Sequence, residues 1–585
     1  MRLLFGWTLT TVVVLLSCNL SCVQAFDQVP VVEIDSGLVS GKVSKTWTGR
    51  TVFGFEGIPY AAPPIGPLRF QEAQPLKPWL GIWNASTPGS SCIQYSHETY
   101  DIEGDEDCLY LNVYTPRLPD QDDLLQGRLL DVLVFIHGGA FMFLEGSSFK
   151  PDFLLDKDIL LVTLNYRLGP IGFFSTGDAV APGNNGLKDQ VQALKWLKRN
   201  VNRFGGNPDK VTISGMSAGG ASVHYHMLSP LSRGLFSKAF SQSGSALCPW
   251  TITEDVPAKS ATIGAYLGCP TKPSSVLVEC LSSRPARKIV EAVKLFMPFM
   301  YNPYSPFGPV VEPPDSEIPF LSELPYRILA KGEAADVPWL SSVATHEGLY
   351  PGSEYVNNEA LLNHIDKNWN QVIPHILDYN YTVPSSRIDE VSQRIRIEYM
   401  GEQPLVKGKT AEFIQMIGDR LFVVDIVKAA QIQAQVGTSP VYMYQFAYRG
   451  RHSLSELFSH STENYGASHA DDTAYALRTK IINVEESEED RSLVPIMVEI
   501  WTSFTKTGKP STGDSSIEWD PLSKDLNETT VPYLKIASPK NIYMEYGEEM
   551  GRKSFWDSLG FNENEQYNFY MGHVCSEDEF CYTIS

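Results

Sequence analysis

The central part of the chain alternates short apolar runs with longer segments in which apolar residues recur every three or four positions. Residues 132–136 and 159–164 are almost uninterrupted apolar runs, which is typical of parallel strands covered on both faces. Residues 188–204 carry apolar side chains on one stripe, which predicts a helix that ends at the glycine pair 205–206. Strands that alternate with helices predict an α/β fold with a large, mostly parallel central sheet and helices on both faces.

Weaker patterns extend this prediction toward both ends of the chain. Residues 31–34 and 38–43 are short β-rich runs, and residues 339–344 and 441–448 are further strand candidates. Residues 494–505 add a helical pattern. No boundary divides the mature chain, so we expect a single domain over residues 26–585. In such sheets reactive groups gather at the carboxyl ends of the strands.

Composition and charge narrow the classes of function. The 585 residues are 43% hydrophobic and 20% charged, as in an ordinary globular protein with a large core. The formal net charge of -21 argues against binding to nucleic acids or to anionic membrane surfaces. The same charge favours a soluble monomer or weak dimer. We find no internal repeat and no low-complexity segment.

The N-terminus has the pattern of a secretory signal peptide. Arg2 precedes an apolar stretch over residues 3–16, and Val23-Gln-Ala25 offers a small-residue cleavage site. A membrane anchor is the alternative, but the apolar run is short and no stop-transfer pattern follows it. We expect cleavage after Ala25 and secretion to the extracellular space. The N-glycosylation sequons that would then be accessible begin at Asn84, Asn380 and Asn527.

Cysteine spacing agrees with an oxidising compartment. Cys92 and Cys108, like Cys269 and Cys280, are close enough in sequence to close small loops. Cys248 would then be left as a buried free thiol. The two C-terminal cysteines, Cys575 and Cys581, could pair with each other or with another chain.

The most informative segment is Gly215-Met-Ser-Ala-Gly219. It follows a strand-like run over residues 211–214 and precedes a helix-forming stretch over residues 220–228. Strand, sharp turn and helix are the context of a Gly-x-Ser-x-Gly nucleophile elbow. The serine, Ser217, would have strained backbone angles, and the N–H of Ala218 would point at developing negative charge. A small-residue turn that happens to contain serine is the alternative for this segment alone.

Serine needs partners for nucleophilic catalysis, and the chain offers candidates for each. His137-Gly-Gly-Ala140 directly follows a predicted strand, and its glycines would turn backbone N–H groups toward a substrate oxygen. Glu347 follows the predicted strand 339–344, and His469 lies in Gly466-Ala-Ser-His469. The chain order of serine, acid and base is that of α/β-hydrolases. Taken alone, Glu347 could be a solvated loop acid and His469 a structural histidine, and His137 and His346 are rival bases.

The chain resembles the carboxylesterase/cholinesterase family of α/β-hydrolases almost from end to end. The motifs that carry the resemblance are Gly57-Ile-Pro-Tyr-Ala61, Pro63-Pro-Ile-Gly66, Glu106-Asp-Cys-Leu-Tyr-Leu-Asn-Val-Tyr-Thr-Pro116, Asn165-Tyr-Arg-Leu-Gly169, Gly183-Asn-Asn-Gly-Leu-Lys-Asp-Gln190, Phe240-Ser-Gln-Ser-Gly244 and Arg552-Lys-Ser-Phe-Trp556. By this resemblance Ser217 is the nucleophile, Glu347 the acid and His469 the base. The oxyanion donors that it implies are Gly138, Gly139 and Ala218.

The resemblance also implies supporting residues. Ser243 would form a hydrogen bond near the triad, and Trp250 and Phe320 would form an aromatic wall of the acyl pocket. A core aromatic role is the alternative for both rings. The cysteine pairs match the family's two common bridges, Cys92–Cys108 and Cys269–Cys280. Its buried ion pairs match Arg69–Glu106 and Arg167–Asp189, with a structural role.

Departures from the family pattern narrow the range of substrates that we expect. Met216 stands where many members have glutamate, so no negative charge adjoins the nucleophile. Residues 93–107 lack the tryptophan with which cholinesterases hold a quaternary ammonium, which argues against choline esters. Insect juvenile hormone esterases carry glutamine at the Met216 position. The chain is most similar to secreted insect carboxylesterases of the β-esterase type, which act on neutral, fairly apolar esters.

We therefore expect a secreted serine carboxylesterase that acts on a small-molecule ester and requires no metal or organic cofactor. An esterase specific for juvenile hormone or a pheromone is one alternative. A non-catalytic adhesion relative, like the neuroligin-type proteins, is an alternative of another class.

Overall fold

A computed structural model describes residues 29–525 and 529–561. Its framework is an 11-stranded sheet with the strand order β16-β15-β14-β13-β12-β11-β9-β10-β8-β4-β3. The strands from β10 to β15 pair in parallel, while β16 at one edge and β8, β4 and β3 at the other pair antiparallel. The prediction of an α/β-hydrolase fold with a mostly parallel sheet is confirmed. The strands are β3 (Lys42–Lys45), β4 (Thr51–Pro59), β8 (Tyr110–Thr115), β9 (Leu130–Ile136), β10 (Leu160–Leu164), β11 (Gly206–Met216), β12 (Lys238–Gln242), β13 (Trp339–Ala344), β14 (Val441–Phe446), β15 (Val531–Ser538) and β16 (Asn541–Gly547).

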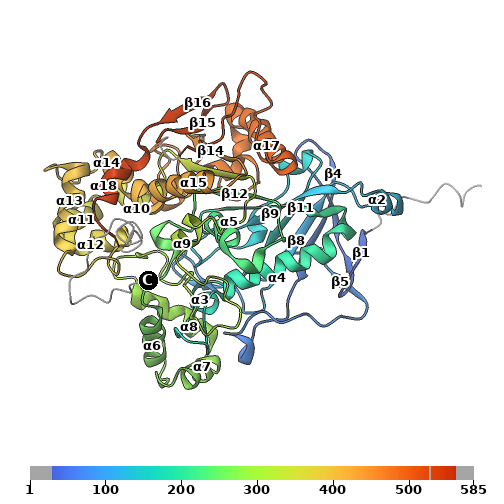
Figure 1. Ribbon diagram of the computed structural model, residues 1–585, viewed down its shortest axis with the longest axis horizontal. Helices are drawn as coiled ribbons and strands as arrows, with labels where there is room; N and C mark the ends of the chain where they lie inside the picture. Colours follow the sequence, from blue (N-terminus) through green and yellow to red (C-terminus); the bar gives the residue numbers. More distant parts are fainter. Residues whose placement is uncertain (1–28, 526–528, 562–585) are drawn as a thin grey trace, which may run out of the picture.

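The apolar run in β9 is continuous because helices cover both faces of the sheet (Figure 1). Val134 and Ile136 pack in one buried cluster, together with residues of α4 (Asn185–Asn200) and α5 (Ala218–Leu228). Leu133 and Phe135 point the other way, into a second cluster that contains residues of α17 (Glu488–Thr507). Successive side chains of a strand alternate between faces, so both parities must be apolar here.

The β-rich run over residues 38–43 forms two strands rather than one. Gly41 separates β2 (Gly37–Ser40) from β3, and β2 joins β1 (Val31–Ile34) and β5 (Ile82–Asn84) in a separate three-stranded sheet. A side chain at Gly41 would place its Cβ 2.5 Å from the carbonyl oxygen of Gly54. The chain therefore needs glycine at the point where it crosses from the small sheet to the large one.

Long insertions follow the carboxyl ends of the parallel strands. Helices α6 (Val256–Tyr266), α7 (Ser274–Ser282) and α8 (Ala286–Glu291) lie between β12 and β13 in the chain and form the lower lobe in Figure 1. A second group occupies the left side of that view and follows β13. Its members are α10 (Leu349–Val356), α11 (Glu359–Lys367), α12 (Trp369–Ile376), α13 (Ile388–Met400) and α14 (Ala411–Gly418).

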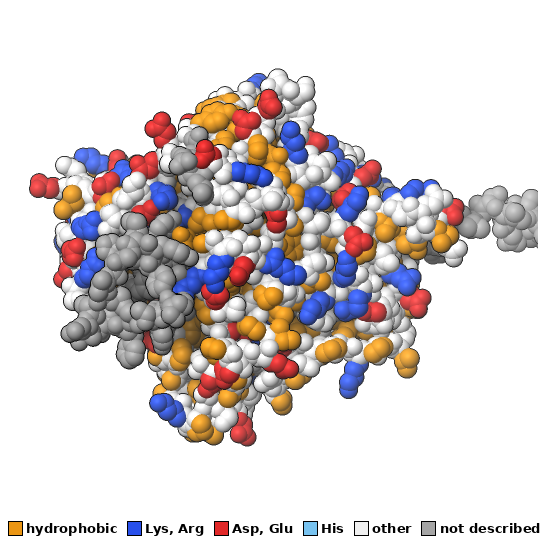
Figure 2. All heavy atoms as spheres, viewed as in Figure 1, with side chains coloured by type: hydrophobic (Ala, Val, Ile, Leu, Met, Phe, Trp, Pro, Cys, Tyr) orange, Lys and Arg blue, Asp and Glu red, His pale blue; other side chains and the backbone are white. Residues whose placement is uncertain are grey.

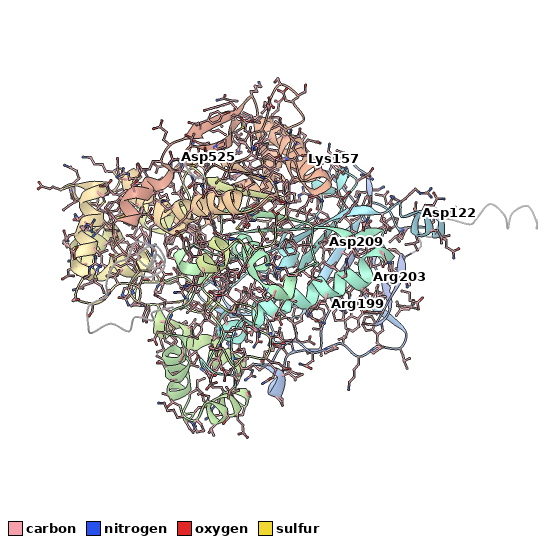
Figure 3. The ribbon with its side chains drawn as sticks, viewed as in Figure 1. Asp122, Lys157, Arg199, Arg203, Asp209 and Asp525 are labelled. Atoms are coloured by element: carbon pink, nitrogen blue, oxygen red, sulfur yellow. A yellow bond between two sulfur atoms is a disulfide. The ribbon has the colours of Figure 1, made fainter. Side chains whose placement is uncertain are left out.

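Charged side chains of both signs lie on the face of the molecule shown in Figure 2, and acidic and basic side chains are interspersed there. Arg199, near the end of α4, pairs with Asp35 at 2.9 Å, and Figure 3 shows it in the half of the molecule away from the α11–α13 lobe.

Within the described ranges no helix is both long and apolar enough to cross a membrane.

Disulfides join Cys92 to Cys108 and Cys269 to Cys280, and Cys248 is a buried free thiol. Asn84 is exposed at the end of β5 and Asn380 is half-buried. The signal-peptide, Asn527, Cys575 and Cys581 predictions lie outside the described residues.

Candidate active site

The candidate nucleophile lies on a strained turn between a strand and a helix. Strand β11 ends at Met216 and helix α5 begins at Ala218, with Ser217 between them at φ 60° and ψ -122°. A Cβ at Gly215 would lie 2.5 Å from backbone atoms of Gly219, and one at Gly219 would lie 2.0 Å from the carbonyl oxygen of Ile136. Only glycine fits at both positions, so this motif is required by the sharp turn that holds Ser217.

The candidate acid and base form a short, buried contact. Glu347 follows β13, and His469 lies in the loop that follows β14. The Nδ1 atom of His469 lies 2.6 Å from Oε2 of Glu347, and the two residues are 2% and 1% exposed. Oε1 of Glu347 accepts hydrogen bonds from Ser243 Oγ and from the backbone N–H of Ala344, both at 2.6 Å. These contacts fix both carboxylate oxygens, so the acid presents a fixed acceptor to the imidazole.

Aromatic rings hold the imidazole of His469. The ring of Tyr350 stacks on it at 5.5 Å between centroids, and the ring of Phe422 lies 4.5 Å away. The Nε2 atom makes no hydrogen bond to any other part of the described chain. His469 and Ser217 line the same cavity, so this nitrogen is available for proton exchange with a group bound there.

The glycine loop after β9 lies against the elbow. A Cβ at Gly138 would lie 2.6 Å from the carbonyl oxygen of Met216 and 3.0 Å from Cβ of Ser217. Gly139 has φ 91° and lines the cavity. Because α5 begins at Ala218, the N–H of that residue has no acceptor within the helix. The arrangement can therefore present backbone N–H groups to an oxygen bound beside Ser217.

The rival histidines lie elsewhere. His137 is buried, its Nδ1 lies 2.9 Å from the carbonyl oxygen of Gly138, and its ring stacks on Tyr166 at 4.4 Å. Burial lowers the pKa of His137 to about 4, so the imidazole is neutral near pH 7. His346 is exposed beside Thr345. Neither lines the cavity that contains Ser217.

The cavity has a volume of about 590 Å³ and is mainly apolar. Glu98, Glu456 and Lys480 are its charged lining residues. The larger apolar side chains come from several segments, and they are Phe143, Leu144, Phe149, Met216, Tyr350, Leu454, Leu457, Phe458, Ile481 and Ile482. A cavity of this size suits a small molecule with substantial apolar surface.

Sequence and structure comparisons give the family. Residues 28–556 match the model of the carboxylesterase family. The chain belongs to the carboxylesterase family. It is 43% identical over 543 residues to Venom carboxylesterase-6 of Apis mellifera, which covers 92% of this chain and 96% of the relative. It is 45% identical over 515 residues to Esterase FE4 of Myzus persicae, covering 87% and 89%.

A solved structure of this family has the same fold. Juvenile hormone esterase from Manduca sexta, with OTFP covalently attached, aligns with a TM-score of 0.79 and 28% identity, over 91% of this chain and 99% of that one. The protein is therefore a carboxylic-ester hydrolase. The roles of individual residues rest on the geometry of this chain.

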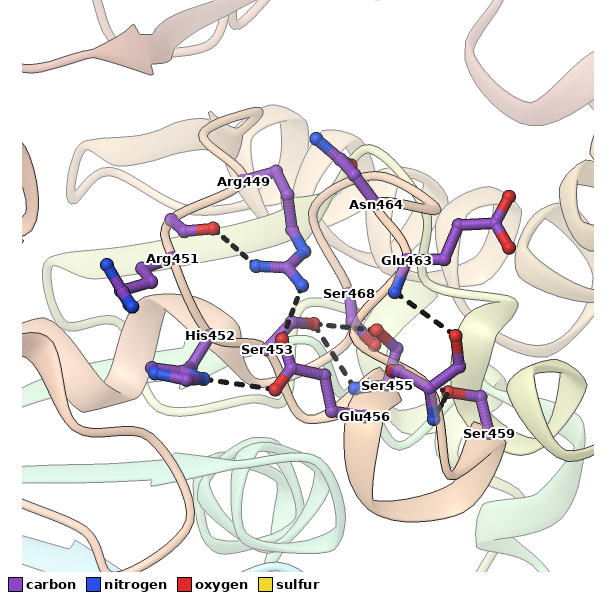
Figure 4. Close-up of polar contacts among 12 residues, drawn as sticks. Arg449, Arg451, His452, Ser453, Ser455, Glu456, Ser459, Glu463, Asn464 and Ser468 are labelled. Carbon is purple, nitrogen blue, oxygen red and sulfur yellow. Dashed lines mark hydrogen bonds and ion pairs between the residues drawn. The ribbon is translucent and has the colours of Figure 1, made fainter.

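One wall of the esterase cavity includes a loop held by polar contacts among Arg449, His452 and Glu456 (Figure 4). Oε1 of Glu456 accepts a hydrogen bond from Arg449 at 2.6 Å, and its Oε2 lies 3.0 Å from Nδ1 of His452. The carboxylate of Asp471 accepts the backbone N–H groups of Leu454 and Ser468, both at 2.8 Å. Since Asp471 is two residues from His469, these contacts hold this wall and the loop of His469 together. Burial raises the pKa of Asp471 to about 7.

The expected acyl-pocket residues are buried but do not line this cavity. The indole N–H of Trp250 donates to the carbonyl oxygen of Leu421 at 2.7 Å, and its ring lies 5.8 Å from that of Phe422. The ring of Phe320 lies 5.6 Å from that of His226 on α5. Trp250 thus reaches the rings around His469, whereas Phe320 packs beneath α5, and the acyl-pocket role stays a prediction for both.

The ion pairs implied by the resemblance are present. Arg167 contacts Asp189 through two hydrogen bonds of 2.6 and 2.7 Å, with both residues buried. Arg69 contacts Glu106 at 2.5 and 2.9 Å and also donates to the carbonyl oxygen of Leu281, beside the second disulfide. Their positions outside the cavity agree with a structural role.

Sequence reasoning missed much of the cavity wall. Tyr350 lies only three residues after Glu347, so its place after a strand end was a usable signal. Phe422 does not line the cavity but packs against His469, and it lies in a helical segment inserted between β13 and β14, where nothing local distinguishes it from a core residue. Residues 453–458 and 479–482 have no motif of their own.

Proposed function

We propose that the protein is a secreted serine carboxylesterase that works through an acyl-enzyme on Ser217, with His469 as the base and Glu347 as the acid. The observation that carries this proposal is the buried 2.6 Å contact between Glu347 and His469, together with the place of His469 and Ser217 in one cavity. A serine hydroxyl is a weak nucleophile unless a base of this kind removes its proton.

The proposed reaction has two halves. Ser217 Oγ attacks the ester carbonyl carbon while His469 Nε2 takes the hydroxyl proton. The backbone N–H groups of Gly138, Gly139 and Ala218 stabilise the tetrahedral oxyanion. His469 then gives its proton to the alcohol oxygen as the carbon–oxygen bond breaks. Water, activated by the same histidine, attacks the acyl-enzyme and releases the acid.

The cavity supports neutral, fairly apolar esters as substrates. Its lining is mostly aliphatic and aromatic, and Met216 puts no charge beside the nucleophile. Hydrolysis of juvenile hormone is a second candidate because a solved juvenile hormone esterase shares the fold. The juvenile hormone esterase of Tribolium castaneum is 34% identical to this chain, a lower identity than those of Venom carboxylesterase-6 and Esterase FE4. An apolar pheromone ester is a further candidate, because the lining of the cavity is mostly apolar.

Secretion is supported by the pattern of residues 1–25 and by the two disulfides. Exposure of Asn84 suits a glycosylated surface. The adhesion-module alternative has less support, because an adhesion protein would not need the strained elbow and the buried Glu347–His469 contact.

Hydrolysis of short-chain nitrophenyl and naphthyl esters by the secreted protein tests the proposal. Ser217→Ala should abolish turnover and the initial burst of nitrophenol. Ser148→Ala is the matched control, since Ser148 lines the same cavity without belonging to the triad. A folded Ser217→Ala variant with wild-type turnover would exclude the proposed nucleophile. Juvenile hormone and simple apolar esters, compared by kcat/KM, separate the two substrate candidates.

A further inference from the structure

Two adjacent residues at the end of β12 contact two members of the proposed triad. The carbonyl oxygen of Gln242 accepts the backbone N–H of Ser217 at 2.8 Å. The hydroxyl of Ser243 donates to Oε1 of Glu347 at 2.6 Å. Ser243 has φ 47°, which is rare for a residue other than glycine, and its own N–H donates to the carbonyl oxygen of Ser342 at 3.0 Å. Nucleophile and acid are therefore held from neighbouring positions of one strand end.

The side chain of Gln242 reaches the loop of the third member. Its Nε2 donates to Oδ2 of Asp472 at 3.0 Å, and Asp472 follows His469 by three residues. The hydroxyl of Tyr444 donates to the same oxygen at 2.7 Å. Gln242 and Tyr444 are fully buried and Asp472 is 2% exposed. Solvent cannot replace either donor, so these contacts orient the carboxylate and the loop that carries it.

We propose that Gln242 is a positioning residue that holds the loop of His469 in register with Ser217. The proposal rests on the triad assigned above. Gln242 carries both links in one residue: its main chain contacts the nucleophile and its side chain contacts the base loop. Tyr444 lies on β14, two strands further along the sheet, and its hydroxyl also accepts a hydrogen bond from Gln242 Nε2 at 3.3 Å. Its link from Asp472 to the elbow therefore runs through Gln242.

Removal of the Gln242 donor leaves Asp472 attached through Tyr444 alone. The base loop can then move relative to Ser217 while the Glu347–His469 contact stays intact. Proton transfer depends steeply on this distance, and a displacement of about 1 Å can cost about 100-fold in rate. Substrate binding depends on the cavity walls, to which Gln242 does not contribute. Loss of the Gln242 donor should therefore lower kcat and leave KM nearly unchanged.

Gln242→Met keeps the volume and removes the side-chain hydrogen bond. We expect kcat for a nitrophenyl ester to fall by about 10- to 100-fold, with KM within threefold of wild type. Inactivation by an organophosphate, which also needs the oriented serine, should slow by the same factor. Tyr444→Phe is the matched control: it loses the other bond to the same oxygen and the 3.3 Å contact with Gln242 Nε2, but it keeps the Gln242–Asp472 bond. Its kcat should fall at most threefold. Gln242→Asn, too short to reach Asp472, is the second variant if Gln242→Met does not fold.

Several results would overturn the proposal. One is a folded Gln242→Met or Gln242→Asn with kcat within threefold of wild type. Another is an equal loss in Tyr444→Phe, which would show that any donor to Asp472 matters equally. A lower melting temperature without a change in kcat would make Gln242 merely structural. Ser217→Ala separates these cases from failure of the proposed function: an inactive Ser217→Ala beside an unaffected Gln242→Met refutes the positioning role alone.

Discussion

Replacement of Glu347 by glutamine should leave the fold intact and fix the wrong tautomer of His469. The carboxylate has two roles divided between its oxygens. Oε1 accepts from Ser243 Oγ and Ala344 N–H, while Oε2 faces Nδ1 of His469 at 2.6 Å. The amide oxygen of glutamine must take the Oε1 position, because an NH₂ group there would face the backbone N–H of Ala344. The NH₂ group then faces His469 and donates to Nδ1, which places the imidazole proton on Nε2.

An imidazole with its proton on Nε2 cannot accept the proton of Ser217. In a serine-protease triad the equivalent amide substitution costs about 10⁴-fold in kcat, and we expect a loss of that order here. Each factor of ten corresponds to about 1.4 kcal/mol, so the barrier should rise by about 5.5 kcal/mol. Ser243→Ala removes one donor to Oε1 but keeps Ala344, so its loss should be about tenfold, in line with about 1.5 kcal/mol for a hydrogen bond to a charged group.

Steady-state and burst kinetics with a nitrophenyl ester measure both variants, with active-site titration to count competent enzyme. Melting curves establish that both variants fold. A Glu347→Gln enzyme that retains more than a tenth of the wild-type kcat would refute the reasoning. The acid would then be sought elsewhere, and the buried carboxylates of the loop that carries His469, Asp471 and Asp472, would be substituted next.

Three more perturbations test other parts of the structure. Gly139→Ala would place a Cβ 2.0 Å from the carbonyl oxygen of Phe143. We therefore expect the glycine loop to shift and kcat to fall about 100-fold. A kcat near that of wild type would contradict the proposed role of the Gly139 N–H as an oxyanion donor. Arg167→Met should cost about 3–5 kcal/mol in urea unfolding, because Asp189 would be buried without its partner, and a loss below 1 kcal/mol would contradict this. Hydrogen bonds that His452 donates to the carboxylates of Glu456 and Glu486 raise its pKa, so this histidine should stabilise the fold fully below about pH 6.5. The benefit, less than about 1 kcal/mol, should disappear as the pH rises through the raised pKa. Melting temperatures of wild type and His452→Gln should therefore converge between pH 6 and 9, and a constant difference would be evidence against it.

The sheet could be predicted from the sequence where burial on both faces leaves an unmistakable pattern. Residues 132–136 and 339–344 are strands in the structure, within β9 and β13, because helices cover each side of them. The helix predicted from residue 188 onward is α4, which begins at Asn185, and its last turn continues as a 3-10 helix to Phe204. Residues 38–43 did not form one strand, because alternation alone does not show that a chain changes sheets at a glycine such as Gly41.

The candidate site could be predicted as far as its chemistry is local. Ser217 lies in a turn that needs glycine two positions before it and two positions after it, so the five residues 215–219 carry the signal. Glu347 and His469 follow strands whose carboxyl ends meet at one edge of a parallel sheet, so chain order and strand position sufficed to name them. Gln242 had no such signal, since its role comes from contact with Asp472, 230 residues away in sequence.

The sequence of the cavity walls is constrained differently from that of the proposed triad. The lining residues in 453–458 and 479–482, and Phe422 packed against His469, belong to connections inserted after the strands. Neither the register of the sheet nor the strain of the elbow constrains their sequences. Their sequences are constrained only by packing against His469 and its loop, as in the 4.5 Å contact between the rings of Phe422 and His469. Substitutions in these connections can therefore change which ester fits while the Glu347–His469 contact stays unchanged. This division explains how carboxylesterases with one catalytic geometry can differ in substrate, and why the sequence predicts the reaction more readily than the ester.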